Sequence, residues 1–416
     1  MVSFLTFLTM VGAAFGPPIA ARRSNPATSD YSIELANIDR ELANLISAPP
    51  DRGSTLEHAT RELYLRYRRA WLTASPADFR SAQEAIDAAL QRSGPVQDFI
   101  LLKVSLDLKL HRLLDARHGL GLLSELADDP GVMTLKADID LQEGRYQDAR
   151  QGYQKIIQKN RTWDGLARLA YLQFITGEEA EAVRLYAEAE AEITAKEMRS
   201  YAWVELQRGL FALKRGRYEE ARRHYDRADR AYSGWWLVQE HMAELLGAEG
   251  RFNEAVALYQ DIITRTPRPE LKQALGDLYA FMGKPELANP LHTQALNEYL
   301  DSARRGETQY FHCLATFYAD VRVDVSEALE WARQDLQLRQ NFATWDALAW
   351  ALYRARRFAE ARAAMDEALA FGVRDSHLFL HAAMIHFAVG RIEDGQRFQK
   401  QASEINPRLE SFHAHR

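Results

Sequence analysis

Small and apolar residues recur along the chain with a period of about 34 residues, most clearly around one short phrase. The phrase reads GRYQDA at 144–149, GRYEEA at 216–221, GRFNEA at 250–255 and RRFAEA at 356–361. Its last residue serves as an anchor, and the anchors are Ala82, Ala116, Ala149, Ala182, Ala221, Ala255, Ala288, Ala328, Ala361 and Gly395. Most steps are 33 or 34 residues, so the chain repeats one structural unit.

Each unit has a second position, twelve residues before its anchor, that is Gly or Ala in eight of the ten units. These residues are Ala70, Val104, Ala137, Ala170, Gly209, Ala243, Gly276, Thr316, Ala349 and Ala383. Four residues after the anchor, the central repeats carry Tyr153, Tyr186, Tyr225 and Tyr259. Small side chains let two helices approach where they cross, and a large side chain fills the adjacent groove. The pattern therefore predicts two packed helices in every unit.

Glycine separates the two predicted helices in most units. The residues are Gly144, Gly177, Gly216, Gly250, Gly283 and Gly390. Glycine takes the left-handed conformation that ends many helices, so the phrase is interpreted as a joint. The first two repeats lack this glycine, and Val323 and Arg356 replace it in two later ones. The steps after Ala182 and Ala288 are 39 and 40 residues, which predicts a longer second helix or a wider loop there.

This pattern resembles the tetratricopeptide repeat (TPR) family over residues 60–407. The best-fitting stretch is TWDALAWALYRARRFAEARAAMDEALAFG, and the late proline of the family pattern occurs as Pro267 and Pro407. The resemblance implies an all-α, right-handed superhelical α-solenoid of about ten TPR-like helix pairs with an N-terminal capping helix. The TPR superhelix is expected over 131–407, preceded by degenerate TPR-like repeats over 55–130.

The chain outside the repeats divides into short regions. Residues 22–54 are predicted to hold a linker and the capping helix, whose apolar stripe is Ile33, Leu35, Ile38, Leu42, Leu45 and Ile46. Residues 408–416 form a C-terminal tail. Residues 2–15 contain no charge, which is typical of a signal peptide, so 1–21 is predicted to be a signal peptide or N-terminal anchor. A periplasmic or secreted protein is expected. The alternative is a cytoplasmic protein, or one anchored by this segment.

In the TPR family the first helix of each pair lines the concave groove. Its ligand-facing positions lie eighteen, fifteen, eleven and eight residues before the anchor. By this resemblance the groove would be lined by aromatic and acidic residues: Tyr64, Tyr67, Trp71, Asp138, Tyr171, Phe174, Trp203, Glu240, Glu244, Asp277, Tyr310, Phe317, Trp350 and Tyr353. Such a groove suits a peptide with apolar anchors and a Lys or Arg. Alternatively, these aromatics pack between repeats, or they stack on a carbohydrate.

Candidate chemistry changes this interpretation little. No phosphate-binding loop, nucleophile elbow or zinc-protease motif occurs. His377 and His381 are four residues apart and would share a helix face, so a metal site is the alternative there. The net charge of −6 argues against nucleic acid as the main partner, and the single Cys313 can form no internal disulfide. The sequence therefore predicts a non-catalytic scaffold that binds a protein or peptide, needs no cofactor and belongs to an envelope-associated assembly. It leaves the oligomeric state open.

Overall fold

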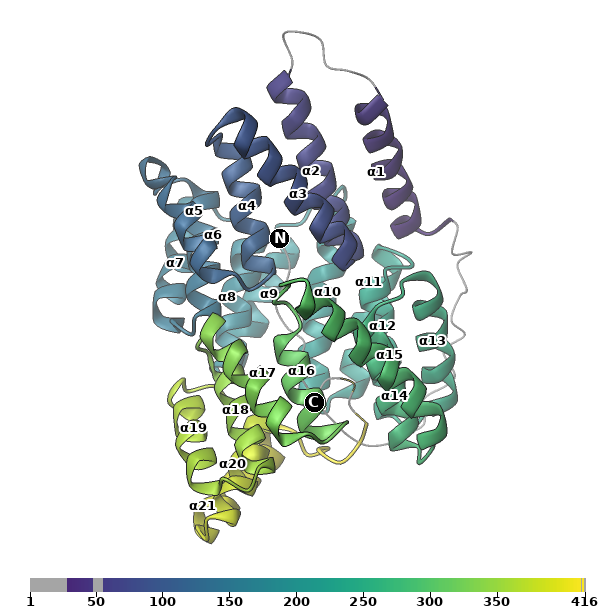
Figure 1. Cartoon of the computed structure of the whole chain (residues 1–416), viewed down its shortest axis with the longest axis vertical. Helices are drawn as coiled ribbons and strands as arrows, with labels where there is room; N and C mark the ends of the chain where they lie inside the picture. Colours follow the sequence, from purple (N-terminus) through teal and green to yellow (C-terminus); the bar gives the residue numbers. More distant parts are fainter. Residues whose placement is uncertain (1–27, 48–54, 413, 415–416) are drawn as a thin grey trace. The chain divides into compact units, whose positions relative to one another are not determined.

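The computed structural model describes residues 28–47, 55–412 and 414, and its regular structure is helical throughout these residues (Figure 1). The α-helices are α1 (Asp30–Ser47), α2 (Thr55–Thr73), α3 (Pro76–Ser93), α4 (Gln97–Lys109), α5 (Leu113–Gly121), α6 (Pro130–Gln142), α7 (Tyr146–Lys159), α8 (Trp163–Ile175), α9 (Glu179–Ala191), α10 (Met198–Lys214), α11 (Tyr218–Ala231), α12 (Trp236–Ala248), α13 (Phe252–Arg265), α14 (Pro269–Phe281), α15 (Pro285–Arg304), α16 (Phe311–Asp320), α17 (Val325–Leu338), α18 (Phe342–Arg354), α19 (Phe358–Ala370), α20 (Ser376–Ala388) and α21 (Ile392–Ile405). A short 3₁₀ helix, η2, spans Ser124–Leu126.

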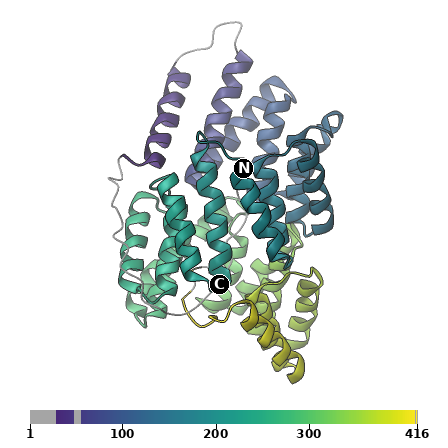
Figure 2. The ribbon, with the colours of Figure 1, turned by 180° about the vertical axis from the view of Figure 1, so that it is seen from behind.

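From α2/α3 to α20/α21 the helices form ten consecutive antiparallel pairs, which can be followed in Figures 1 and 2. Every anchor residue lies on the second helix of its pair and is buried. The residue twelve positions earlier lies on the first helix, and it is buried in every pair except at Thr316, which is half-buried. The expected all-α fold of TPR-like helix pairs is therefore confirmed.

Contacts at the crossings explain why these positions are small. Gly209 lies so close to the Tyr225 ring that an added Cβ would overlap it, and Gly276 stands in the same relation to His292. In both pairs a residue four positions after the anchor occupies the space over the glycine. The four tyrosines at this position are fully buried. Tyr153 donates a hydrogen bond to Asp138 at 2.8 Å; the other three fill space without a hydrogen-bond partner for their hydroxyl groups.

The joints have the predicted backbone conformation. All six joint glycines have positive φ, and Gly216 is typical at 66°. Its N–H donates to Leu213 O, and the Arg217 N–H reaches Ala212 O at 2.8 Å, which satisfies carbonyl groups at the end of α10. Arg356 keeps the same conformation, with φ of 59°, without being glycine. Val323 does not, because the chain there leaves α16 differently and Asp324 caps α17.

Residue contacts divide the described chain into two compact units, 28–160 and 161–414. The first unit contains α1 and three helix pairs. Helix α1 lies along α2, held by ion pairs that include Arg68–Glu34 at 2.6 Å and Arg69–Asp39 at 2.7 Å. Two residues of its predicted apolar stripe stay outside the packing: Ile33 is 50% exposed and Ile46 is 62% exposed.

The second unit contains seven helix pairs and also joins elements far apart in sequence. The loop before α20 contacts the α8/α9 joint, where the Arg374 N–H donates to Ile175 O at 2.8 Å. Beside it, Lys214 pairs with Asp375 at 3.3 Å across 161 residues. The extra residues after Ala182 lengthen both the loop at 192–197 and α10, and those after Ala288 lengthen α15, which continues through Pro290.

The segment predicted to be a signal peptide or anchor, residues 1–21, lies outside the described residues. Among the residues that are described, no helix combines the length and the apolar character that a membrane crossing requires.

Candidate functional site

The residues predicted to line a groove lie on the first helices of the pairs. We call the residues eighteen, fifteen, eleven and eight positions before each anchor the first-helix face. In the first unit, Tyr64 is 46% exposed, and the rings of Tyr67 and Trp71 meet edge to face with centroids 6.2 Å apart. Lys109 lies over the Trp71 ring. Asp138 is buried and bonded to Tyr153, so it stabilises the helix crossing.

Several predicted aromatics of the second unit pack between helices. Phe174 is 3% exposed and stacks on Phe211 with centroids 3.6 Å apart, and Tyr171 is also buried. Trp203 is half-buried against Trp163. Phe174 and Tyr171 therefore offer little surface to a ligand, whereas Trp203 keeps part of its ring exposed.

Tyr310 and Phe317 are equally enclosed. Both pack on Tyr299, with centroids 4.9 Å and 6.4 Å away, and they are 4% and 1% exposed. The structure thus places these two aromatics in the core of the second unit.

The acidic residues of the middle repeats lie on α12 and α14. Glu240 and Glu244 are buried on one face of α12, and a Glu244 oxygen lies 3.3 Å from His241 Nδ1. Asp277 on α14 is half-buried, and its oxygen lies 2.9 Å from His292 Nε2. Glu244 and Asp277 therefore have polar partners within the protein.

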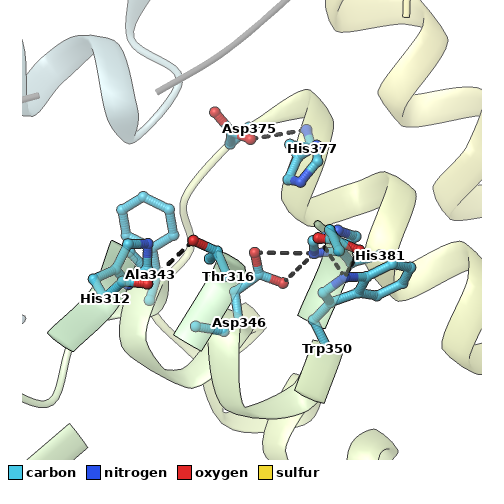
Figure 3. Close-up of a pocket in the computed structure, with 11 residues that line it drawn as sticks. His312, Thr316, Ala343, Asp346, Trp350, Asp375, His377 and His381 are labelled. Carbon is cyan, nitrogen blue, oxygen red and sulfur yellow. Dashed lines mark hydrogen bonds and ion pairs between the residues drawn. The ribbon is translucent and has the colours of Figure 1, made fainter. Parts of the chain in front are cut away.

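A pocket opens between α16, α18 and α20 in the second unit (Figure 3). It is lined by His312, Thr316, Asp320, Phe342, Ala343, Asp346, Ala347, Trp350, Asp375, His377 and His381. All four positions of the first-helix face are represented: His377, Asp346, Trp350 and Asp320 lie eighteen, fifteen, eleven and eight residues before their anchors. The structure therefore brings these four positions, taken from three successive pairs, to one cavity.

Trp350 and His381 line the pocket and belong to a stack of three rings, whose third member, Tyr353, lies outside the lining. The Trp350 ring is nearly parallel to His381 at 4.0 Å and to Tyr353 at 4.9 Å. Its indole N–H donates to both oxygens of Asp320, each at 3.0 Å. The hydrogen bond orients the Asp320 carboxylate, whose side chain is 34% exposed.

His381 lies between Trp350 and the Asp346 carboxylate, which is 2.9 Å from its Nδ1 (Figure 3). Burial works against a charge on this ring, but Asp346, with Asp320 and Asp375 farther off, raises the pKa of the His381 imidazole above its usual value. A protonated His381 facing the indole adds a cation–π contact to the stack.

Asp375 is the N-cap of α20, and its side chain accepts hydrogen bonds from the backbone N–H groups of His377 and Leu378. Burial works against its charge, but Lys214 and these N–H groups bring the pKa of the Asp375 carboxyl below its usual value. His377 meets the His381 ring at 4.0 Å between centroids. Within the residues that the structure describes, no group of three or more His, Cys, Asp or Glu side chains is placed to hold a metal ion.

Trp350, Tyr353, His377 and His381 are candidates from the sequence, whereas the carboxylates beside them were missed. Asp320 and Asp346 occupy first-helix positions, so a search of those positions for charge as well as aromatic character would have found them. Asp375 and His312 lie outside these positions, and their place in the pocket depends on the packing of neighbouring pairs.

Comparisons with known proteins give structural likeness only. No family model matches the sequence, and no curated protein matches it. A crystal structure of the APC/C hetero-tetramer Cut9-Hcn1 is similar over 91% of this chain and 80% of that chain, with a TM-score of 0.46 and 16% identity. A monomeric mutant of IFIT1 with Gppp-AAAA is similar over 90% of this chain and 89% of that chain, with a TM-score of 0.46 and 12% identity.

Proposed function

We propose that the chain is a non-catalytic scaffold that holds a segment of a partner protein on the first-helix face of its second unit. A basic side chain of that segment would enter the pocket between α16, α18 and α20. The observation that carries the proposal is the convergence of all four first-helix positions on this pocket, with a partly exposed carboxylate held in place by an indole.

The size and charge of the pocket suit the tip of a lysine. The cavity volume is about 30 Å³, which has room for only a small polar group, since one water molecule takes about 30 Å³ of the liquid. A primary ammonium group fits this space better than a planar guanidinium group. Asp320 supplies the charge, because its nearest cation is Arg354 at 3.7 Å, whereas Asp346 and Asp375 have closer partners in His381 and Lys214.

Other ligand classes fit less well. A sugar needs an open aromatic face, and Trp350 is only 7% exposed because His381 and Tyr353 stack on it. Nucleophilic chemistry at the single cysteine is disfavoured, because burial raises the pKa of the Cys313 thiol to about 12. An envelope location stays a prediction from the sequence of residues 1–21.

Selection of displayed random peptides on the folded protein tests this function even though the partner is unidentified. Lysine-containing peptides should be enriched. Asp320→Asn keeps the acceptor for the indole N–H but removes the charge, so it should weaken the selected peptides by about 10- to 100-fold, as expected for a charge-assisted hydrogen bond.

The matched control is Glu330→Gln on the second helix α17, where the side chain is exposed and bonds only within its own helix. This variant should bind the selected peptides as well as the wild type does. A selection without basic enrichment, or equal affinity for wild type and Asp320→Asn, would overturn the proposed function.

A further inference from the structure

The chain beyond α21 returns to the first-helix face of its own unit. After Ile405, residues 406–414 contain no helix or strand in their described part. Phe412 is nevertheless 1% exposed, and Ala414 is 2% exposed. Burial of an aromatic ring from a non-helical segment needs a prepared surface, and α12 provides one.

The seat for Phe412 is a glycine on the first-helix face. Gly247 lies eight residues before the anchor Ala255, and a Cβ placed on it would overlap the Phe412 ring. The ring also meets Phe281 of α14 edge to face, with centroids 5.9 Å apart. Any side chain larger than hydrogen at position 247 would exclude the ring from this seat.

Two further contacts hold the segment against the second unit. The Ala414 N–H donates to Glu244 Oε1 at 3.4 Å, and Glu244 lies eleven residues before the same anchor. Four residues before Phe412, the Arg408 guanidinium lies over the Tyr218 ring of α11 at 4.8 Å. Segment 406–414 thus combines an aromatic anchor, a small residue two positions later and a preceding arginine.

We propose that segment 406–414 is a built-in competitor, and that the surface around Gly247 and Glu244 is a docking site for a partner segment of the same chemistry. That segment places an aromatic side chain over Gly247 and a small residue at Glu244, and it carries an arginine on its N-terminal side. The proposal rests on the proposed function, in that the first-helix face accepts protein segments, but it concerns α12 and α14 rather than the pocket of α16, α18 and α20.

The short chain that links Phe412 to α21 acts as a tether, and it explains how such a site is regulated. Only residues 407–411 separate Phe412 from Asn406, which is fully buried at the end of α21. A short tether holds a bound segment at an effective concentration in the millimolar range. If the segment binds in trans with a dissociation constant of about 10 to 100 μM, the tethered copy weakens a competitor by about 10- to 100-fold.

The test compares the full chain with a variant that ends at Asn406. The probe is a fluorescent peptide with the sequence of residues 406–416, and its control carries alanine in place of Phe412. The shortened variant should bind the probe but not the control peptide, and the full chain should bind the probe about 10- to 100-fold more weakly. Gly247→Ala in the shortened variant should abolish binding although alanine favours the helix.

Competition separates a docking site from a purely structural role of the segment. Peptides selected on the shortened variant should include aromatic sequences that compete with the probe. Absence of competing peptides, absence of probe binding, or equal probe binding by the full chain would each overturn the proposal. If the shortened variant does not fold, as judged by circular dichroism, the same comparison uses full-length Phe412→Ala, in which the seat is open.

The two proposals fail independently. Asp320→Asn should leave binding of the 406–416 probe unchanged, because Asp320 lies outside this seat. If the probe fails to bind while lysine peptides still depend on Asp320, the docking site at α12 is wrong and the proposed function stands. If the probe binds and the lysine peptides do not depend on Asp320, the proposed binding of lysine in the pocket is wrong. The proposal that the first-helix face binds protein segments is then retained.

Discussion

Glycines at the helix crossings are important because, without a side chain, they let a side chain of the facing helix approach closely. On α5, Gly119 faces Val104 of α4, and a Cβ built on it would lie 2.5 Å from Val104 Cγ2. Val104 is fully buried, and a β-branched side chain has few other rotamers available within a helix. Two positions along the same helix, Gly121 has nothing within 4 Å of the corresponding Cβ position.

Gly119→Ala should therefore destabilise the first unit relative to Gly121→Ala. Alanine improves helix propensity by up to about 1 kcal/mol in a helix interior, and the gain is smaller at Gly121, the last residue of α5. The clash at Gly119 must therefore outweigh the larger propensity gain. We expect Gly119→Ala to be less stable by about 1 to 3 kcal/mol, the usual cost of overpacking. Denaturant unfolding combined with hydrogen exchange of α4 and α5 measures the difference. Equal stability of the two variants would show that these helices do not cross at this position.

The joint between paired helices is set by backbone conformation more than by side-chain contacts. Gly250 has φ of 77°, and nothing lies within 4 Å of the position of its absent Cβ. Arg356 takes the same conformation with φ of 59°, and its side chain is exposed. A left-handed conformation costs a residue with a side chain about 1 to 2 kcal/mol, so the α18/α19 joint contains strain that the α12/α13 joint lacks.

Opposite substitutions at these two joints should have opposite effects. Arg356→Gly should stabilise the second unit by about 0.5 to 1 kcal/mol, since relief of strain exceeds the added freedom of glycine in the unfolded chain. Gly250→Ala should destabilise the same unit by about 1 kcal/mol. Chemical denaturation of both variants against the wild type provides the measurement, and a loss of stability in Arg356→Gly would contradict this explanation of the joint.

The helix pairs could be predicted from the sequence because their contacts are local. Gly209 and Tyr225 are sixteen residues apart and belong to one repeat unit, so the periodic pattern of small residues predicts their contact. The candidate site is different. Its pocket joins α16, α18 and α20, and the Lys214–Asp375 pair spans 161 residues. Such contacts depend on the rotation of each pair against the next, which no single repeat specifies. The seat of Phe412 on Gly247 was not predicted for the same reason.

The second unit combines two kinds of structure in one chain. Its helix pairs provide the frame, and contacts between distant pairs, such as Arg374 with Ile175, restrain it. Its first helices carry a pocket at α16, α18 and α20 and, at α12, the position where Phe412 packs over Gly247. The function proposed for the chain depends on this first-helix face, because the second helices contribute the anchors that hold each pair together.

Photo-crosslinking of a selected lysine peptide tests this claim most directly. A photoreactive group is placed next to the lysine, and the attachment sites on the intact protein are located by mass spectrometry. We expect crosslinks on α16, α18 and α20, close to Asp320, Asp346 and His377. Crosslinks that fall on the second helices α17, α19 and α21 would contradict the proposed role of the first-helix face.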